Sequence, residues 1–354
     1  MKILHTADMH LRATGDERWS ALEKVLEIAR AHRVSLIVIA GDFFSRQLDA
    51  HLLKVPLRKL MQSVDCPVVI LPGNHDVLAL SAGDDYGENV TVMASHETHL
   101  DIGDVRLFGL PFEKIVGERV LERLLSIKSR IRPAASNILL YHGELLDLSY
   151  SGKSFGDEER SGYMPVRLSF FDNLGLDYVL AGHFHSNFEA VRYSGGYFVY
   201  PGSPVSVTKK ETGIRKVNLF EVGEPPRAEI VNSFHYRDVD VYLNPFSMKD
   251  PLETIERETR GSHPDARVQL TVSGFVDLEM LGKTEKEFSA AVRSRLSSRV
   301  DLVSAQWRDI SSVRRNGLFI RFLEKLEAAG QPEGVKRELR RLAMESMMEA
   351  SVAD

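Results

Sequence analysis

The sequence predicts an α/β protein whose sheets combine parallel and antiparallel strands, followed by a small α+β domain and C-terminal helices. Short apolar runs alternate with amphipathic stretches of helical period over residues 1–71, a pattern typical of β-α-β units with parallel strands. A hairpin signal at Gly103-Asp104 then indicates antiparallel strands. From about Arg237 the pattern changes to two helix–strand pairs and two terminal helices.

The elements of the first domain, which we predict over residues 1–236, follow in a regular order. We expect strands at 2–7, 35–40 and 67–71, with helices between them at 17–33 and 50–62. Pro56 is expected to kink the second helix or delay its start. Further on we expect strands at 90–93, 98–102, 105–110 and 137–141 and a helix at 118–131. After a polar loop at 146–164 come a short helix at 165–173 and strands at 176–181, 187–193, 196–200, 214–222 and 227–236.

The rest of the chain divides into a small α+β domain, predicted over 237–312, and a helical segment over 313–354. The small domain comprises helices at 250–260 and 284–298 and strands at 267–274 and 301–309. The last segment contains helices at 318–329 and 332–350, each with one apolar face. Such a face either binds a partner helix or packs on the small domain, and the sequence leaves both open.

Composition limits the classes of function. The formal net charge of −5 does not indicate a nucleic-acid binder, although binding depends on a local basic surface and not on the sum. No window approaches the roughly 18 apolar residues of a membrane span. The polar residues His5, Asp8 and His10 exclude a signal peptide at the start, and the single Cys66 excludes an internal disulfide. We therefore expect a cytoplasmic protein without a membrane partner.

Side chains that bind metals follow five of the predicted strands. They are Asp8, His10, Asp42, Asn74, His75, His142, His183 and His185. Parallel strands of an open α/β sheet place their sites beyond the carboxyl ends, so these side chains should converge. Each motif alone also has a plain structural explanation as a turn, a cap or a core histidine. Together, in this order, they predict a site for manganese, iron or zinc, and because they are too many for one tetrahedral ion, two ions would share Asp42.

The ordered motifs Asp-x-His, Gly-Asp, Gly-Asn-His-Asp, Tyr-His-Gly-Glu and Gly-His-x-His resemble those of the calcineurin-like metallophosphoesterases, a fold of two packed sheets flanked by helices. The opening ten residues, the Tyr-Pro-Gly-Ser-Pro segment at 200–204 and the small domain followed by helices are similar to the SbcD family of DNA repair nucleases. The resemblance implies two divalent ions, usually manganese. One would be held by Asp8, His10, Asp42 and His185, and the other by Asp42, Asn74, His142 and His183.

The same resemblance implies a two-metal DNA nuclease of double-strand-break repair. It would act as a 3′ to 5′ exonuclease on duplex ends and as an endonuclease on single strands. It would be a homodimer, and its C-terminal helices would bind an SbcC-type ATPase. His75 would face the scissile phosphate, and Asp76 is a candidate for orienting its ring.

One position departs from the SbcD pattern. Relatives often carry His or Asp near Ser45, and a serine cannot act as an acid there. Candidate contacts to DNA phosphates are Arg12, Arg46, Lys153, Lys209 and Lys210. Two alternatives remain open: a phosphodiesterase for small nucleotides and a non-catalytic scaffold for DNA ends.

Overall fold

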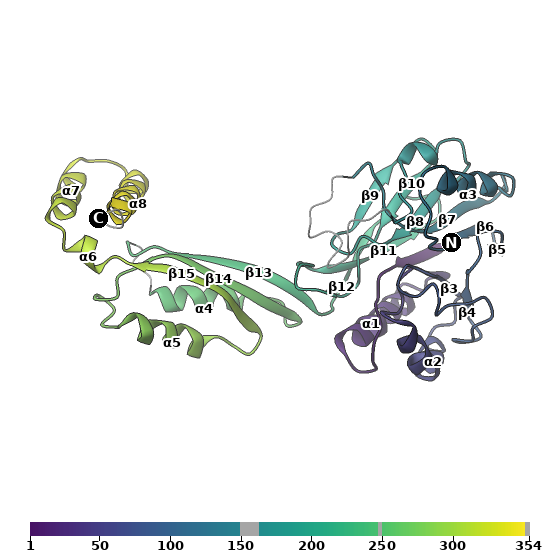
Figure 1. The fold of residues 1–354 in the computed structure, drawn as a ribbon, viewed down its shortest axis with the longest axis horizontal. Helices are drawn as coiled ribbons and strands as arrows, with labels where there is room; N and C mark the ends of the chain where they lie inside the picture. The colour runs from purple at the N-terminus through teal and green to yellow at the C-terminus, as the bar shows by residue number, and fades with distance from the viewer. Residues whose placement is uncertain (149–162, 247–249, 351–354) are drawn as a thin grey trace. The chain divides into compact units, whose positions relative to one another are not determined.

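The computed structural model describes residues 1–148, 163–246 and 250–350, and the chain divides into two compact units, Met1–Tyr236 and Arg237–Asp354 (Figure 1). The predicted segment over 313–354 falls within the second unit, so its independence from the small domain stays a prediction. Most of the predicted loop at 146–164, including Lys153, lies outside the described residues. Within those residues, no helix is both long and apolar enough to cross a membrane.

The first sheet of the first unit has the strand order β12-β11-β1-β2-β3-β4. Its strands are β1 (Lys2–Thr6), β2 (Leu36–Ala40), β3 (Val68–Leu71), β4 (Val90–Val92), β11 (Arg215–Glu221) and β12 (Ala228–Val231). Strands β1 to β4 pair in parallel, so their carboxyl ends lie at the same edge. Helices α1 (Glu17–Ala31) and α2 (Gln47–Met61) connect β1 to β2 and β2 to β3.

The second sheet has the order β5-β6-β7-β8-β10-β9. Its strands are β5 (His99–Ile102), β6 (Val105–Leu110), β7 (Ser136–His142), β8 (Tyr178–Gly182), β9 (Glu189–Arg192) and β10 (Tyr197–Tyr200). Strands β6, β7, β8 and β10 run parallel, while β5 and β9 pair antiparallel at the two edges. The hairpin predicted at Gly103-Asp104 joins β5 and β6.

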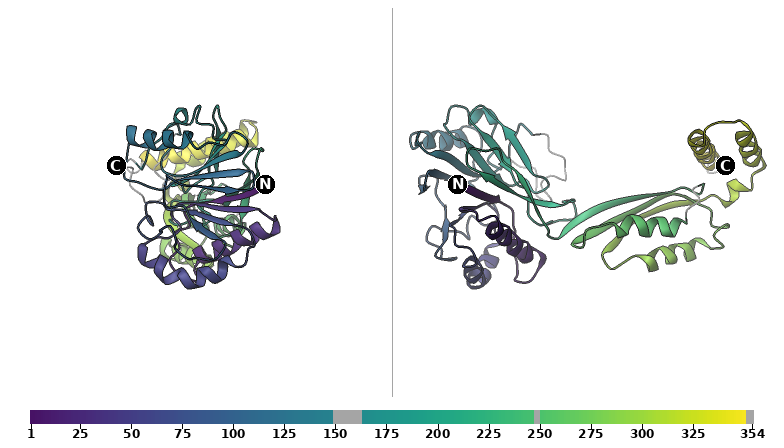
Figure 2. Two further views of the ribbon diagram at one scale, coloured as in Figure 1. Left: turned by 90° about the vertical axis from the view of Figure 1, so that its right-hand side faces the viewer. Right: turned by 180° about the vertical axis from the view of Figure 1, so that it is seen from behind.

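The two sheets pack face to face with helices on the outside (Figures 1 and 2). One apolar cluster lies between the sheets and includes Val38 and Val69 from the first and Leu140 and Leu180 from the second. A second cluster joins α1 and α2 to the first sheet, and a third joins α3 (Glu118–Lys128) to the second sheet. The structure therefore confirms the predicted class, a two-sheet α/β sandwich flanked by helices.

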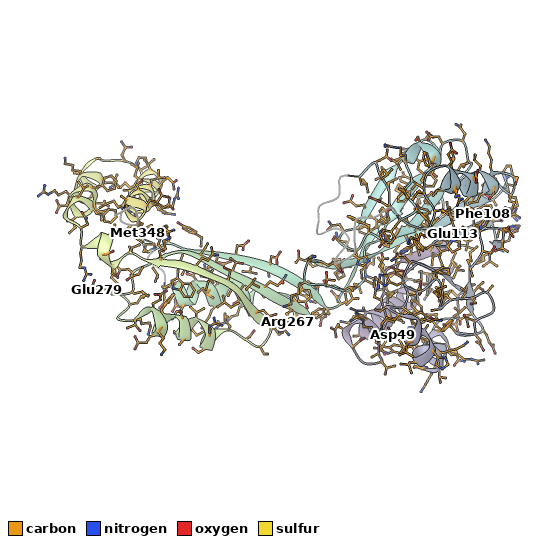
Figure 3. All side chains as sticks on the ribbon, viewed as in Figure 1. Asp49, Phe108, Glu113, Arg267, Glu279 and Met348 are labelled. Carbon is orange, nitrogen blue, oxygen red and sulfur yellow. The ribbon has the colours of Figure 1, made fainter. Side chains whose placement is uncertain are left out.

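The second unit is built on the three-stranded sheet β13-β14-β15. Its elements are β13 (His235–Leu243), α4 (Pro251–Arg260), β14 (Ala266–Val276), α5 (Glu285–Arg295), β15 (Val300–Asp309), α6 (Ser311–Arg314), α7 (Gly317–Ala328) and α8 (Glu333–Ala350). Phe319 of α7 and Met348 of α8, the latter labelled in Figure 3, pack with Phe275 of β14. One face of the terminal helix pair therefore packs on the small domain itself.

Three expectations need correction. The helix predicted at 165–173 is only a 3-10 turn at Leu168–Phe170, because Val166 pairs with Leu145 in a short parallel bridge that holds the chain extended. Pro56 lies inside α2, which begins earlier than expected at Gln47. The strand predicted at 227–236 is divided, since β12 ends at Val231 and β13 begins at His235.

Candidate metal centre

The candidate ligands lie where parallel strands of both sheets end. The ends of β1, β2 and β3 belong to the first sheet, and those of β7 and β8 belong to the second. Asp8, His10, Asp42 and His183 have left-handed backbone conformations, and they are four of the seven non-glycine residues with positive φ among those described. Such conformations cost energy and collect at functional sites. The concentration of strained backbone thus marks this edge of the sandwich.

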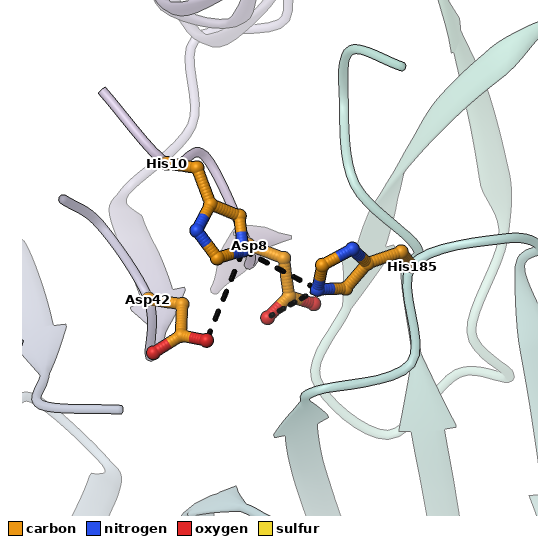
Figure 4. A group of neighbouring side chains, drawn as sticks. All are labelled: Asp8, His10, Asp42 and His185. Carbon is orange, nitrogen blue, oxygen red and sulfur yellow. Dashed lines mark hydrogen bonds and ion pairs between the residues drawn. The ribbon is translucent and has the colours of Figure 1, made fainter. Parts of the chain in front are cut away.

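Four buried side chains point toward one another at this edge (Figure 4). They are Asp8, His10, Asp42 and His185, and one ligand atom from each lies within 4.8 Å of the others. Nε2 of His10 is 3.3 Å from Nε2 of His185 and 3.8 Å from Oδ2 of Asp42. Two carboxylates and two imidazoles so arranged match the donors that borderline divalent cations prefer.

A second group adjoins the first and shares Asp42. Nε2 of His142 is 2.9 Å from Oδ1 of Asn74 and 3.4 Å from Oδ2 of Asp42. The ring of His183 lies 5.4 Å from that of His142, centroid to centroid. Oδ2 of Asp42 is buried and accepts no hydrogen bond from the described residues, although imidazole nitrogens of both groups face it. A buried oxygen of this kind is costly unless a cation or donor compensates it, so the cluster fits a dinuclear site for divalent ions.

Backbone groups hold the candidate ligands in place. The Asp8 carboxylate accepts hydrogen bonds from the His183 amide at 3.0 and 3.1 Å, which ties the end of β1 to the end of β8. Oδ1 of Asp42 accepts from the His75 amide at 2.9 Å. Nδ1 of His142 lies 2.9 Å from the Ala40 carbonyl oxygen, which can only accept. The proton of His142 is therefore drawn to Nδ1, and Nε2 is left to face Asp42 and Asn74.

Buried charges at the site shift one another's ionisation. Burial raises the pKa of the Asp8 carboxyl to about 6, against the attraction of the His185 and His142 imidazoles. Burial would also raise the pKa of Asp42, but His142 outweighs this and lowers it well below its usual range. Burial opposes protonation of His142, yet the Asp42 carboxylate raises its pKa to about 10. A bound cation would take the place of that proton beside Asp42.

His75 is set apart from the buried groups. Its side chain is exposed and lines a pocket of about 730 Å³, and its ring lies 4.9 Å from that of His10, centroid to centroid. The carboxylate of Asp76, the candidate for orienting this ring, is buried and accepts hydrogen bonds from the backbone. Its two oxygens accept from the amides of Gly73, at 2.7 Å, and Phe44, at 3.0 Å. Asp76 therefore joins the loop after β3 to the loop after β2.

The basic residues predicted to contact DNA phosphates differ in whether they line this pocket. Arg12, Lys209 and Lys210 line the pocket. Arg46 instead forms a two-point ion pair with the buried Asp49, at 2.7 and 3.0 Å. Both bonds come from its guanidinium group, so the charge of Arg46 is already paired with a carboxylate of helix α2.

Ser45 lies in the pocket but is fully engaged within the protein. Its hydroxyl donates to the His10 carbonyl oxygen at 2.7 Å and accepts from Arg18 at 2.7 Å and from Arg12 at 3.1 Å. Ser45 thus supports the loop of His10 and the guanidinium group of Arg12.

Sequence reasoning missed three residues of the site: Arg18, Tyr163 and Glu211. Arg18 donates to the His10 carbonyl oxygen from the first turn of α1, and the ring of Tyr163 packs at a tilt against that of His183, 4.6 Å from centroid to centroid. Glu211 is fully buried, with Oε1 3.3 Å from Nδ1 of His185. Burial would raise the pKa of Glu211, but His185 lowers it below its usual value. Each residue stands in a polar stretch with no strand-end signal, so nothing local pointed to it.

A two-sheet sandwich with a buried carboxylate and imidazole cluster at one edge fits a metal-dependent phosphoesterase. The chain belongs to the calcineurin-like phosphoesterase family, whose model matches residues 1–187. It is 26% identical over 249 residues to the D subunit of the nuclease SbcCD from Staphylococcus epidermidis. That match covers 59% of this chain and 64% of the length of the relative.

Two solved structures show weaker likeness. The protein TT1561 of Thermus thermophilus is 15% identical with a TM-score of 0.44, and the match covers 65% of this chain and 98% of that one. A dimetal phosphatase from Danio rerio is 10% identical with a TM-score of 0.41, again covering 65% and 98%.

Proposed function

We propose that this chain is a two-metal DNA nuclease and the nuclease subunit of an SbcCD-like complex in double-strand-break repair. The observation that carries the proposal is the pair of adjoining ligand groups that share Asp42, with the exposed His75 beside them in the pocket. The relative from Staphylococcus epidermidis, named as part of a nuclease, supports the choice of DNA as substrate.

The ligand assignment follows the two groups. Asp8, His10, Asp42 and His185 would hold one ion. Asp42, Asn74, His142 and His183 would hold the other, with manganese as the proposed metal. Bound divalent cations supply Lewis acidity, which polarises a phosphodiester and lowers the pKa of water. Asp42 places the two groups side by side, and the Ala40 carbonyl keeps Nε2 of His142 available.

His75 is the proposed catalytic residue. It is exposed in the pocket and would contact the scissile phosphate, where its imidazole donates a proton to the departing sugar oxygen. Arg12, Lys209 and Lys210, which line the same pocket, would neutralise neighbouring backbone phosphates. We propose 3′ to 5′ cleavage of duplex ends and endonuclease action on single strands.

Two exposed apolar surfaces support the proposed partners. Helix α2 presents Leu48, Leu52 and Val55 at helical spacing to solvent, and we propose that this face joins two copies of the chain. Leu318 of α7 and Leu339 and Leu342 of α8 are also exposed. None of the three belongs to the apolar cluster that packs on the small domain, so we propose that they bind an SbcC-type ATPase.

Digestion of an end-labelled DNA duplex by the purified chain tests the function. Manganese, magnesium and chelator are compared, Asp42→Ala serves as the metal-site variant, and a small phosphodiester serves as a second substrate. We expect short labelled products that require manganese and disappear in Asp42→Ala. Intact DNA beside a hydrolysed small phosphodiester would instead identify a nucleotide phosphodiesterase. Bound metal without activity on either substrate, even with the ATPase partner present, would identify a scaffold.

A further inference from the structure

Glu211 contacts the metal centre from outside the proposed ligand set. It precedes β11 and is fully buried. Oε1 lies 3.3 Å from Nδ1 of His185, on the side of the ring opposite to Nε2. Nε2 faces His10 at 3.3 Å and Asp8 at 3.9 Å. The ring of His185 therefore stands between Glu211 and the first ligand group.

The hydrogen bonds that Glu211 accepts indicate that its side chain is an ionised carboxylate. Oε2 accepts from the amide of Val207 at 2.8 Å, and Oε1 accepts from the amide and the hydroxyl of Thr208 at 3.2 and 3.1 Å. An amide N–H can only donate, so both oxygens of Glu211 act as acceptors. His185 must then donate from Nδ1, and the lone pair of its neutral ring is left on Nε2, the nitrogen that faces the ligand group.

We propose that Glu211 is a positioning residue for the metal centre. By holding the Nδ1 proton of His185, it fixes the tautomer and the angle of that ring and thereby sets the affinity of the ion bound with Asp8, His10 and Asp42. The inference rests on the proposed function for the role of His185 as a ligand. Carboxylates that hold ligand histidines in this way commonly change metal affinity by about 10- to 100-fold.

The same carboxylate also shapes the substrate pocket. Its bonds to Val207 and Thr208 close the turn that contributes Val207, Thr208, Lys209 and Lys210 to the pocket wall. The fully buried Arg215 supports this turn from behind, because its guanidinium donates to the carbonyl oxygens of Ser203, His185 and Glu211. Glu211 thus connects a metal ligand to the cationic wall.

A glutamine at this position cannot make the same contacts. Each oxygen of Glu211 accepts from a backbone amide, so an amide NH2 would face a donor whichever way the side chain is turned. If the NH2 faces His185, Nδ1 must accept, and the proton moves to Nε2, where it blocks metal binding. If it faces Val207, the carbonyl oxygen still accepts from His185, but the turn loses the hydrogen bond from Val207 that holds this side chain in place.

Titration of Mn²⁺ into the metal-free full chain tests the inference without measuring activity. We expect Glu211→Gln to lower the affinity for one of the two ions, the one bound by His185, by about 10- to 100-fold. The affinity for the other ion should stay at its wild-type value. Glu113→Gln is the matched control, since Glu113 also pairs with a histidine, His96 at 3.5 Å, but does not line the pocket. It should bind both ions as the wild type does.

Thermal unfolding of the metal-free variants separates positioning from a purely structural role. Unchanged affinity for both ions in folded Glu211→Gln would overturn the proposal, as would an equal loss of both ions with a lower melting temperature. If Glu211→Gln does not fold, the test uses Glu211→Asp. This change withdraws the carboxylate from His185 by one methylene, so it must lower the affinity for the same single ion. A wild-type chain that binds two ions but leaves DNA intact would refute the proposed function and not this inference.

Discussion

Replacing Gly182 with alanine tests how closely the two sheets meet at the metal centre. Gly182 ends β8, and a Cβ atom there would lie 2.0 Å from the carbonyl oxygen of Ala40 at the end of β2. It would also lie 2.9 Å from Nδ1 of His142. An ordinary contact needs about 3.4 Å. The obstructing oxygen belongs to the backbone, so it cannot rotate away as a side chain would.

Gly182→Ala should therefore destabilise the fold and weaken metal binding together. Overpacking costs about 1–3 kcal/mol, and we expect the upper end because one sheet must move. The displaced Ala40 carbonyl is the acceptor that orients His142, so the metal affinity should fall by about 10- to 100-fold.

Urea unfolding of the metal-free chain gives the first quantity, and Mn²⁺ titration gives the second. Gly334→Ala is the control, since Gly334 lies on helix α8 and, outside the backbone of its own helix, no atom of the described residues lies within 4 Å of its added Cβ. It should raise stability by up to about 1 kcal/mol and leave metal binding unchanged. A Gly182→Ala chain with wild-type stability and metal affinity would refute the close approach of β2 and β8.

Three further predictions concern the site and the surface. His75→Ala should retain both metals but lose about 10²- to 10⁴-fold in turnover, and loss of metal in this variant would make His75 a ligand instead. Arg12→Ala should weaken DNA binding and reduce its salt dependence by about one phosphate contact, whereas Arg46→Ala, whose cation is paired with Asp49, should change neither; equal effects would contradict this distinction. Leu52→Asp should leave the fold intact, because this side chain is 61% exposed, and should give a monomer in sedimentation; a stable dimer would rule out the α2 face.

The strands were predictable because their signal is local. Runs such as residues 36–40 and 138–141 are apolar throughout, and strands buried on both faces carry this pattern. The helix expected at 165–173 failed because tertiary pairing of Val166 with Leu145 overrides local preference. The continuation of β13 to Leu243 was missed, although Val239, Val241 and Leu243 alternate with polar residues as a half-buried strand does.

The sequence by itself determined the family, the sheet-forming segments and the chemical types gathered at the strand ends. It could do so because each candidate ligand directly follows an apolar run, and parallel strands bring such positions to one edge. Only the tertiary structure decided which other residues contact these candidate ligands and hold them in place. Glu211 reaches His185 across 26 residues, and Ala40 reaches His142 across 102. Contacts at such separations depend on how the sheets and loops pack, which no local pattern records.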